Sequence, residues 1–176
     1  MAALLGADPE FREMLDAVAA LDLPDGWIGA GAVRNRIWDA LHGFDRPQTA
    51  GDVDVVYFDP AALTPDRDRH LAAALANAMP DHDWQVRNQA RMHDGNGDPP
   101  YRDTAEAMRH WPETATAIGA RLSGGAIELL APFGYADLLG LVIRPTPAFR
   151  AKPELFRARQ ASKQWLERWP NLRTAS

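Results

Sequence analysis

The sequence predicts an α/β (α+β) fold in which helices flank a mixed sheet and a helix closes the C-terminal end. The chain has 176 residues, of which 46% are apolar, enough for one domain with a hydrophobic core. Short segments rich in Val, Ile, Tyr and Phe alternate with segments whose apolar residues recur every three or four positions. Such alternation is typical of a sheet with helices packed against it. We expect residues 1–176 to form a single domain.

Helix signals are clear in the first half of the chain. Asp8 and Pro9 can cap and open one helix, and Thr64 and Pro65 can open another. Between them lies a helix that Gly43 is expected to stop. The apolar faces are Phe11, Met14, Leu15 and Val18; then Val33, Ile37 and Leu41; then Leu71, Leu75 and Met79.

The remaining elements follow from composition and alternation. Strands are predicted over residues 27–31, 52–59 and 84–92, and a hairpin is predicted from 115–122 and 126–132. Residues 93–101 have the composition of a loop, and 103–111 can form a short helix. A last helix is predicted over 153–169, with Trp165 and Trp169 docking it to the core.

Composition limits the partners. The formal net charge of −5 argues against DNA or tRNA as partners, because such binding needs clustered Lys and Arg, but it allows a small basic pocket for one nucleotide. No cysteine is present, so thiolate chemistry is excluded. The first residues lack the pattern of a secretory signal, and the most apolar window, residues 127–143, is interrupted and short for a bilayer. A cytoplasmic protein with no membrane partner is expected.

Two aspartates interrupt an otherwise apolar strand. Asp52 and Asp54 are two residues apart, so their side chains point to the same face. Two carboxylates this close repel each other, and burial would raise that cost. Solvent exposure, a shared proton or a bound divalent cation would each relieve it. Mg²⁺ takes carboxylate oxygens and completes its shell with water and substrate phosphates.

A glycine-containing junction precedes this strand. Gly29 and Gly31 stand where a strand is expected to pass into a helix, and glycine there lets a ligand approach the backbone. Arg34 in the first helical turn can add a positive fork for phosphate. The structural alternative is a tight turn with Arg34 in a surface ion pair.

Residues 28–43 and 52–58 resemble the head of the nucleotidyltransferase fold typified by DNA polymerase beta. The similarity is to the CCA-adding enzymes and bacterial poly(A) polymerases, which carry G-G-x-V-R-D, a helix ending in L-x-G, and D-x-D. This chain has Ala30 in place of one glycine and Asn35 in place of the aspartate.

Over residues 25–170 the chain also resembles a group of small bacterial nucleotidyltransferase-like proteins, formerly a domain of unknown function. The matching segments are "IGAGAVRN", "DVDVVYFD", "NQARMH", "WPETATAIGARL", "APFGYADLL" and "RPTPAF". The resemblance implies a nucleotidyltransferase fold and supplies no substrate.

The resemblance also implies a chemistry. A nucleoside monophosphate would pass from a triphosphate to an acceptor hydroxyl, with Asp52 and Asp54 holding Mg²⁺, or Mn²⁺ as the alternative. The residues expected to bind the nucleotide are Gly29, Gly31, Arg34, Asn35 and Arg91.

The family pattern usually adds a third carboxylate. Glu128 is the candidate, although alternation also allows it to face solvent. The segment "WQVRNQARMH", residues 84–93, offers Asn88 and His93 where an acid could otherwise stand, which would leave the triad incomplete.

Two further segments have weaker signals. Alternation would place Arg87, Gln89, Arg91 and His93 on one face, as a base or phosphate contact or as a solvated edge strand. Residues 111–117 could reach a ribose, or could form a structural corner around Trp111.

The leading hypothesis is therefore a Mg²⁺-dependent nucleotidyltransferase that acts on an unknown small-molecule or protein acceptor. The alternative is a non-catalytic nucleotide-binding or regulatory module with a degenerate site. A third, a structural domain with a vestigial site, is also retained.

Overall fold

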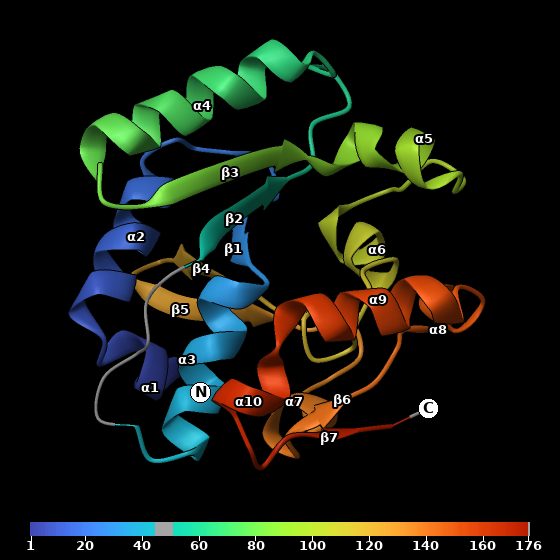
Figure 1. Ribbon diagram of the computed structural model, residues 1–176. Coiled ribbons are helices and arrows are strands. Elements are labelled where there is room, and N and C mark those ends of the chain that lie inside the picture. The colour runs from blue at the N-terminus through green and yellow to red at the C-terminus, as the bar shows by residue number, and fades with distance from the viewer. Residues whose placement is uncertain (45–50, 176) are drawn as a thin grey trace.

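A mixed five-stranded sheet forms the centre of the computed structural model, which describes residues 1–44 and 51–175. The strands run in the order β3-β2-β1-β4-β5 (Figure 1). β2 and β3 are parallel, and the other neighbours are antiparallel. Their bounds are Trp27–Gly29 (β1), Asp52–Tyr57 (β2), Asp83–Asn88 (β3), Gly119–Ser123 (β4) and Ala126–Leu130 (β5). The predicted mixed sheet with flanking helices is confirmed.

Helices surround this sheet on both sides. They are α1 (Ala2–Gly6), α2 (Pro9–Ala19), α3 (Gly31–Leu41), α4 (Pro65–Ala78), α5 (Met92–Asn96), α6 (Thr104–Arg109), α7 (Ala136–Leu139), α8 (Pro147–Arg150), α9 (Pro153–Lys163) and α10 (Trp165–Arg168), with a 3₁₀ turn at Gln89–Arg91. Short strands β6 (Val142–Ile143) and β7 (Arg173–Thr174) pair in parallel. Within the described residues, no helix is both long and apolar enough to cross a membrane.

The two faces of the sheet differ in character. One face carries the apolar core, and α2 and α4 pack against it (Figure 1). Val53, Val55 and Tyr57 of β2 lie on this face and are buried, as is Leu75 of α4. The alternating residues Asp52, Asp54 and Val56 of β2 therefore face the other side.

The C-terminal segment reaches the region beside α3 (Figure 1). The rings of Trp165 and Trp169 meet Trp38 of α3 edge to face, with centroids 5.7 and 5.2 Å apart. Trp169 also donates its Nε1–H to the buried Asp39 at 2.8 Å. The expected docking of this tail through its tryptophans is observed.

Several predicted boundaries hold. The Asp8 carboxylate accepts from Phe11 N at 3.2 Å and caps α2, with Pro9 at the first position. Thr64 and Pro65 open α4, and Gly43 follows α3 with φ of 70°. The predicted hairpin is present as β4 and β5.

Other boundaries were wrong for local reasons. The strand expected over 84–92 ends at Asn88, because its side chain accepts from Ala90 N at 3.1 Å and starts a turn. Residues 93–96, expected in a loop, belong to the helix Met92–Asn96. The helix expected over 153–169 is interrupted at Gln164, which has φ of 50°.

The junction between β1 and α3 is strained at Ala30. Its φ of 50° and ψ of −123° lie in a region that L-residues rarely adopt. Gly29 beside it has a conventional backbone but no room for a side chain, because a Cβ would lie 2.9 Å from the Trp111 ring.

We predict that Ala30→Gly stabilises the protein by about 1 kcal/mol, because glycine adopts this backbone without strain. Gly29→Ala, the neighbouring control, should instead destabilise it by overpacking against Trp111. Urea unfolding of the two variants checks both signs. An Ala30→Gly protein less stable than wild type would contradict the assigned backbone.

Candidate functional site

A cavity of about 350 Å³ opens where β1 passes into α3, beside the start of β2. We call it the charged cavity. Its lining includes Gly31, Arg34 and Asn35 from α3, Asp52 and Asp54 from β2, Thr116, and Arg159, Lys163 and Trp165 from α9 and α10. Segments far apart in the sequence thus bring both signs of charge to one cavity.

The two aspartates form its acidic side. Asp52 is exposed, whereas Asp54 is half-buried. Burial, and after it the charge of Asp52, raise the pKa of Asp54 to about 6 against the opposing effect of Arg34. At neutral pH the pair therefore carries unfavourable negative charge that a bound cation would relieve.

The donor set fits a hard divalent cation with few protein ligands. In residues 1–44 and 51–175, no group of three histidine or acidic side chains is positioned to hold a metal. Two carboxylates on one strand face are sufficient for Mg²⁺ when water and phosphate oxygens complete its shell. Asp52 and Asp54 are thus suited to a metal that binds together with a phosphate ligand.

Arg34 forms the floor of the cavity and is buried, not a surface ion-pair residue. It donates from Nη1 to Thr116 Oγ1 at 2.7 Å and from Nη2 to Asn35 Oδ1 at 2.8 Å. The guanidinium also stacks on the Trp165 ring, 4.1 Å from its centroid. Burial lowers the pKa of Arg34 to about 10, so it remains charged at neutral pH.

The start of α3 lies on the same wall of the cavity. The N-cap residue is Ala30, whose side chain cannot accept a hydrogen bond, so no described side chain caps the first N–H groups of the helix. Gly31 at the first helical position would place a Cβ only in ordinary contact with Asn35 and Arg34, so the backbone is open to a ligand. Gly29 is not in the cavity lining, and packing against Trp111 accounts for it.

Sequence reasoning missed the basic side of the cavity. Arg159, Lys163 and Arg168 come from the C-terminal helices, which were read only as a packing element. Arg159 is fixed by the buried Glu113, whose Oε1 lies 2.7 Å from Arg159 Nε. The available signal was the run of basic residues after position 153 in a chain of net charge −5.

The structure contradicts Glu128 as the third carboxylate. It lies on β5, separated from β2 by β1 and β4. Three strand spacings of about 4.8 Å place it roughly 14 Å from β2. Its carboxylate pairs with Arg121 at 2.7 Å, which lowers the pKa of Glu128. Another acid, Asp83 of β3, pairs in register with Asp52. The Asp83 carboxylate accepts a hydrogen bond from Gln85 Nε2 at 2.9 Å.

Arg91 is also misplaced by the sequence prediction. It follows the turn at Asn88, so strand alternation does not apply, and it pairs with Asp68 of α4. Asp68 is buried and accepts from the Tyr57 hydroxyl at 2.7 Å, on the apolar face of the sheet. Arg91 therefore stabilises the packing of α4 rather than a ligand.

A second cavity adjoins the first on the same side of the sheet. We call this cavity, of about 360 Å³, the aromatic cavity, after Trp111 and Phe149 in its lining. Arg87 and Gln89 line it, as one of the sequence alternatives allowed, whereas Arg91 and His93 do not. The 111–117 segment contributes Trp111 and Thr116.

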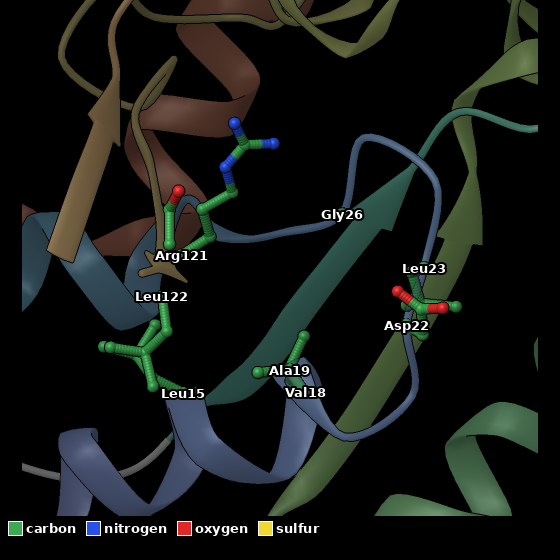
Figure 2. A pocket seen from close by; sticks show the side chains of 9 residues that line it. Leu15, Val18, Ala19, Asp22, Leu23, Gly26, Arg121 and Leu122 are labelled. Carbon is green, nitrogen blue, oxygen red and sulfur yellow. The ribbon is translucent and has the colours of Figure 1, made fainter. Parts of the chain in front are cut away.

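A third, smaller cavity of about 200 Å³ lies at the opposite end of the sheet. Among the described residues, its lining has neither a pair of carboxylates nor an aromatic ring. Leu15, Val18 and Leu122 line it, and Arg121 directs its guanidinium away from them (Figure 2). That guanidinium stacks on Trp27, with 4.1 Å to the ring centroid, and pairs with Glu128.

This sheet, with a strand-to-helix junction beside paired aspartates, has the architecture of a nucleotidyltransferase head domain. The match of residues 16–174 to the nucleotidyltransferase family model shows that the chain belongs to this family. The resemblance seen in the sequence is thereby confirmed. None of the curated proteins matches the chain.

Solved structures agree with this assignment. A protein whose NMR structure is described as revealing a CCA-adding enzyme head domain matches with a TM-score of 0.86 and 33% identity, over 98% of this chain and 94% of that one. A CCA-adding enzyme in complex with CTP matches with a TM-score of 0.57 and 19% identity, over 99% and 43%. The CCA-adding enzyme of Bacillus stearothermophilus, also with CTP, matches at 0.52 and 20%, over 86% and 38%. The chain thus spans less than half of these two enzymes, which show the fold alone.

We predict that Asp54→Asn stabilises the protein at pH 8 by on the order of 2 kcal/mol. The pKa of Asp54 is about 6 in the folded protein against an ordinary 3.8, so between these values the folded state takes up a proton that the unfolded chain does not. Wild-type stability should therefore rise as pH falls from 6 towards 4, and the advantage of the variant should shrink.

Urea unfolding at pH 8, 6 and 4.5 measures this difference. Glu128→Gln is the control, because Arg121 lowers the pKa of Glu128 and its removal should bring no gain at pH 8. An Asp54→Asn variant no more stable than wild type at pH 8 would refute the strained carboxylate pair.

Proposed function

We propose that the protein transfers a nucleoside monophosphate from a nucleoside triphosphate to a hydroxyl group of a small-molecule or protein acceptor. The observation that supports this most is the charged cavity, where the Asp52–Asp54 pair faces basic side chains and a helix N-terminus. Phosphoryl groups need positive charge along their length and a metal at the reacting phosphorus. The charged cavity supplies the positive charge, and its two carboxylates are suited to the metal.

Each part of the cavity has a distinct task in this proposal. The first N–H groups of α3, open at Gly31, bind the terminal phosphates, and Lys163 and Arg159 neutralise their charge. Arg34 keeps a fixed positive charge beneath them, with its fork held by Thr116 and Asn35. The leaving pyrophosphate is thus stabilised by groups that need no rearrangement.

Asp52 and Asp54 would hold Mg²⁺, with Mn²⁺ as the alternative, and the cation would stabilise the charge that develops at the reacting phosphate. The raised pKa of Asp54 gives this carboxylate more to gain from a cation than an exposed aspartate has. The charges of Arg34 and Lys163 oppose the rise in the pKa of Asp54 that burial causes, so the basic side chains are close to the acidic ones. In this proposal one ligand contacts both sides of the cavity.

Similar solved structures support a nucleoside triphosphate as the ligand, and they do not identify the acceptor. CCA-adding enzymes of this fold have been solved with CTP, which supports a nucleoside triphosphate as the ligand here. The net charge of −5 supports a small molecule or a protein over nucleic acid as the acceptor. We also propose that the chain works as one unit in the cytoplasm.

A non-catalytic nucleotide-binding module is the second candidate. It is favoured by one observation, that the described residues gather two acids rather than three at the cavity. Such a module would bind the triphosphate and leave the bond between its α- and β-phosphates intact. Release of pyrophosphate from radiolabelled triphosphate, with water or a metabolite mixture as acceptor, distinguishes the two.

We predict that ATP, GTP, CTP or UTP binds to the wild-type protein in the presence of Mg²⁺. Asp52→Asn should weaken this binding by about tenfold or more, because the cation loses one of its two protein ligands. Lys163→Met should weaken it by about tenfold through the loss of a charged phosphate contact. Isothermal titration calorimetry with and without Mg²⁺ measures both effects.

Glu128→Gln is the matched control, since it removes an acid from the same sheet face outside the cavity. It should bind the nucleotide as wild type does. A nucleotide affinity that is the same with and without Mg²⁺, or that is unchanged in Asp52→Asn, would contradict the proposed role of the aspartates.

A further inference from the structure

The charged and aromatic cavities share a wall. Ala30, Asp54, Thr116 and Arg159 line both of them. A ligand whose phosphates occupy the first cavity and whose reacting phosphate lies at Asp54 can therefore extend into the second. The aromatic cavity, at about 360 Å³, is within the size range of small-molecule pockets.

The lining of the aromatic cavity is suited to a flat ring. Trp111 follows α6 and Phe149 lies in α8, and both are only half-buried, so part of each ring remains open. Large aromatic side chains with open faces are the usual surfaces on which nucleobases stack. Trp165 and Trp169 line the charged cavity, but both are buried and offer less open ring surface.

Polar groups at the edge of the cavity are held in place. Asn96 donates from Nδ2 to the Tyr101 hydroxyl at 3.0 Å, and Tyr101 donates to Asp98 at 2.5 Å. His110 Nδ1 lies 2.9 Å from the same Asp98 carboxylate. Of this chain of groups, Asn96 and His110 line the cavity, so an amide and an imidazole are presented in fixed positions.

We propose that the aromatic cavity binds the base of the nucleoside triphosphate and that Phe149, Asn96 and His110 determine base preference. This inference rests on the proposed function, because it takes the phosphates to lie in the charged cavity. A base is tethered to its phosphates by one ribose, so the cavity that shares Asp54 is the one within reach. Its flat faces stack on Trp111 or Phe149, and its polar edge meets the amide and imidazole.

The test compares nucleoside triphosphates with inorganic tripolyphosphate, which has the phosphates and lacks the base. Titrations in Mg²⁺ should show at least one of ATP, GTP, CTP and UTP binding about tenfold tighter than tripolyphosphate. In Phe149→Ala this margin should fall to about threefold or less, while the tripolyphosphate Kd stays at its wild-type value. Asn96→Ala should reduce the preference among the four bases.

The tripolyphosphate Kd also reports whether each variant is folded. Phe133→Ala is the control, because Phe133 is another half-buried ring and does not line the cavity. A margin that survives in Phe149→Ala, together with an unchanged base preference in Asn96→Ala, would overturn the proposal. Equal Kd values for triphosphates and tripolyphosphate in wild type would also overturn it, while leaving the charged cavity supported. Binding of neither probe would overturn this inference and the proposed function together.

Discussion

The burial of the Arg34 guanidinium is the constraint on which the site depends. A buried charge is costly unless hydrogen bonds and opposite charges compensate it. Thr116 and Asn35 accept its hydrogen bonds, Trp165 covers its face, and Glu113 and Asp54 oppose its charge. These partners come from α3, the segment before β4, β2 and the C-terminal helices. Within the described residues the buried Nε of Arg34 has no hydrogen-bond partner, so the contacts of Nη1, Nη2 and the ring face are what link the walls of the charged cavity to one another.

The same arrangement explains why an apolar strand carries two aspartates. Val53, Val55 and Tyr57 are buried on one face of β2, so the apolar core needs only alternate positions of this strand. The opposite face is left for ligands, at the cost of burying the Asp54 carboxylate and placing it beside Asp52, and both effects raise the pKa of Asp54. The buried, charged carboxylate of Asp54 lowers the stability of the folded protein at the position where a cation is expected to bind, as is common in functional sites.

Sequence patterns predicted what depends on local chemistry. Periodicity and turn residues predicted the hairpin and the helix starts at Asp8 and Thr64. The family resemblance brought together five residues that line the charged cavity: Gly31, Arg34, Asn35, Asp52 and Asp54. Glu128 and Arg91 were misplaced because their surroundings depend on strand order and on where β3 ends. Arg159 and Lys163 were missed because their helix packs across the site from over 100 positions away in the sequence (Figure 1). The role of Asp52 and Asp54 remains a prediction.

The most direct test of the central claim, a metal–nucleotide site at Asp52 and Asp54, is a crystal structure with Mn²⁺ and a nucleoside triphosphate whose α,β-bridging oxygen is replaced by methylene. Anomalous scattering locates the metal without reference to the fold. The account predicts a Mn²⁺ peak about 2.2 Å from carboxylate oxygens of both aspartates, in contact with the phosphates. Ordered nucleotide in the charged cavity with Mn²⁺ bound elsewhere, or nucleotide bound outside that cavity, would contradict it.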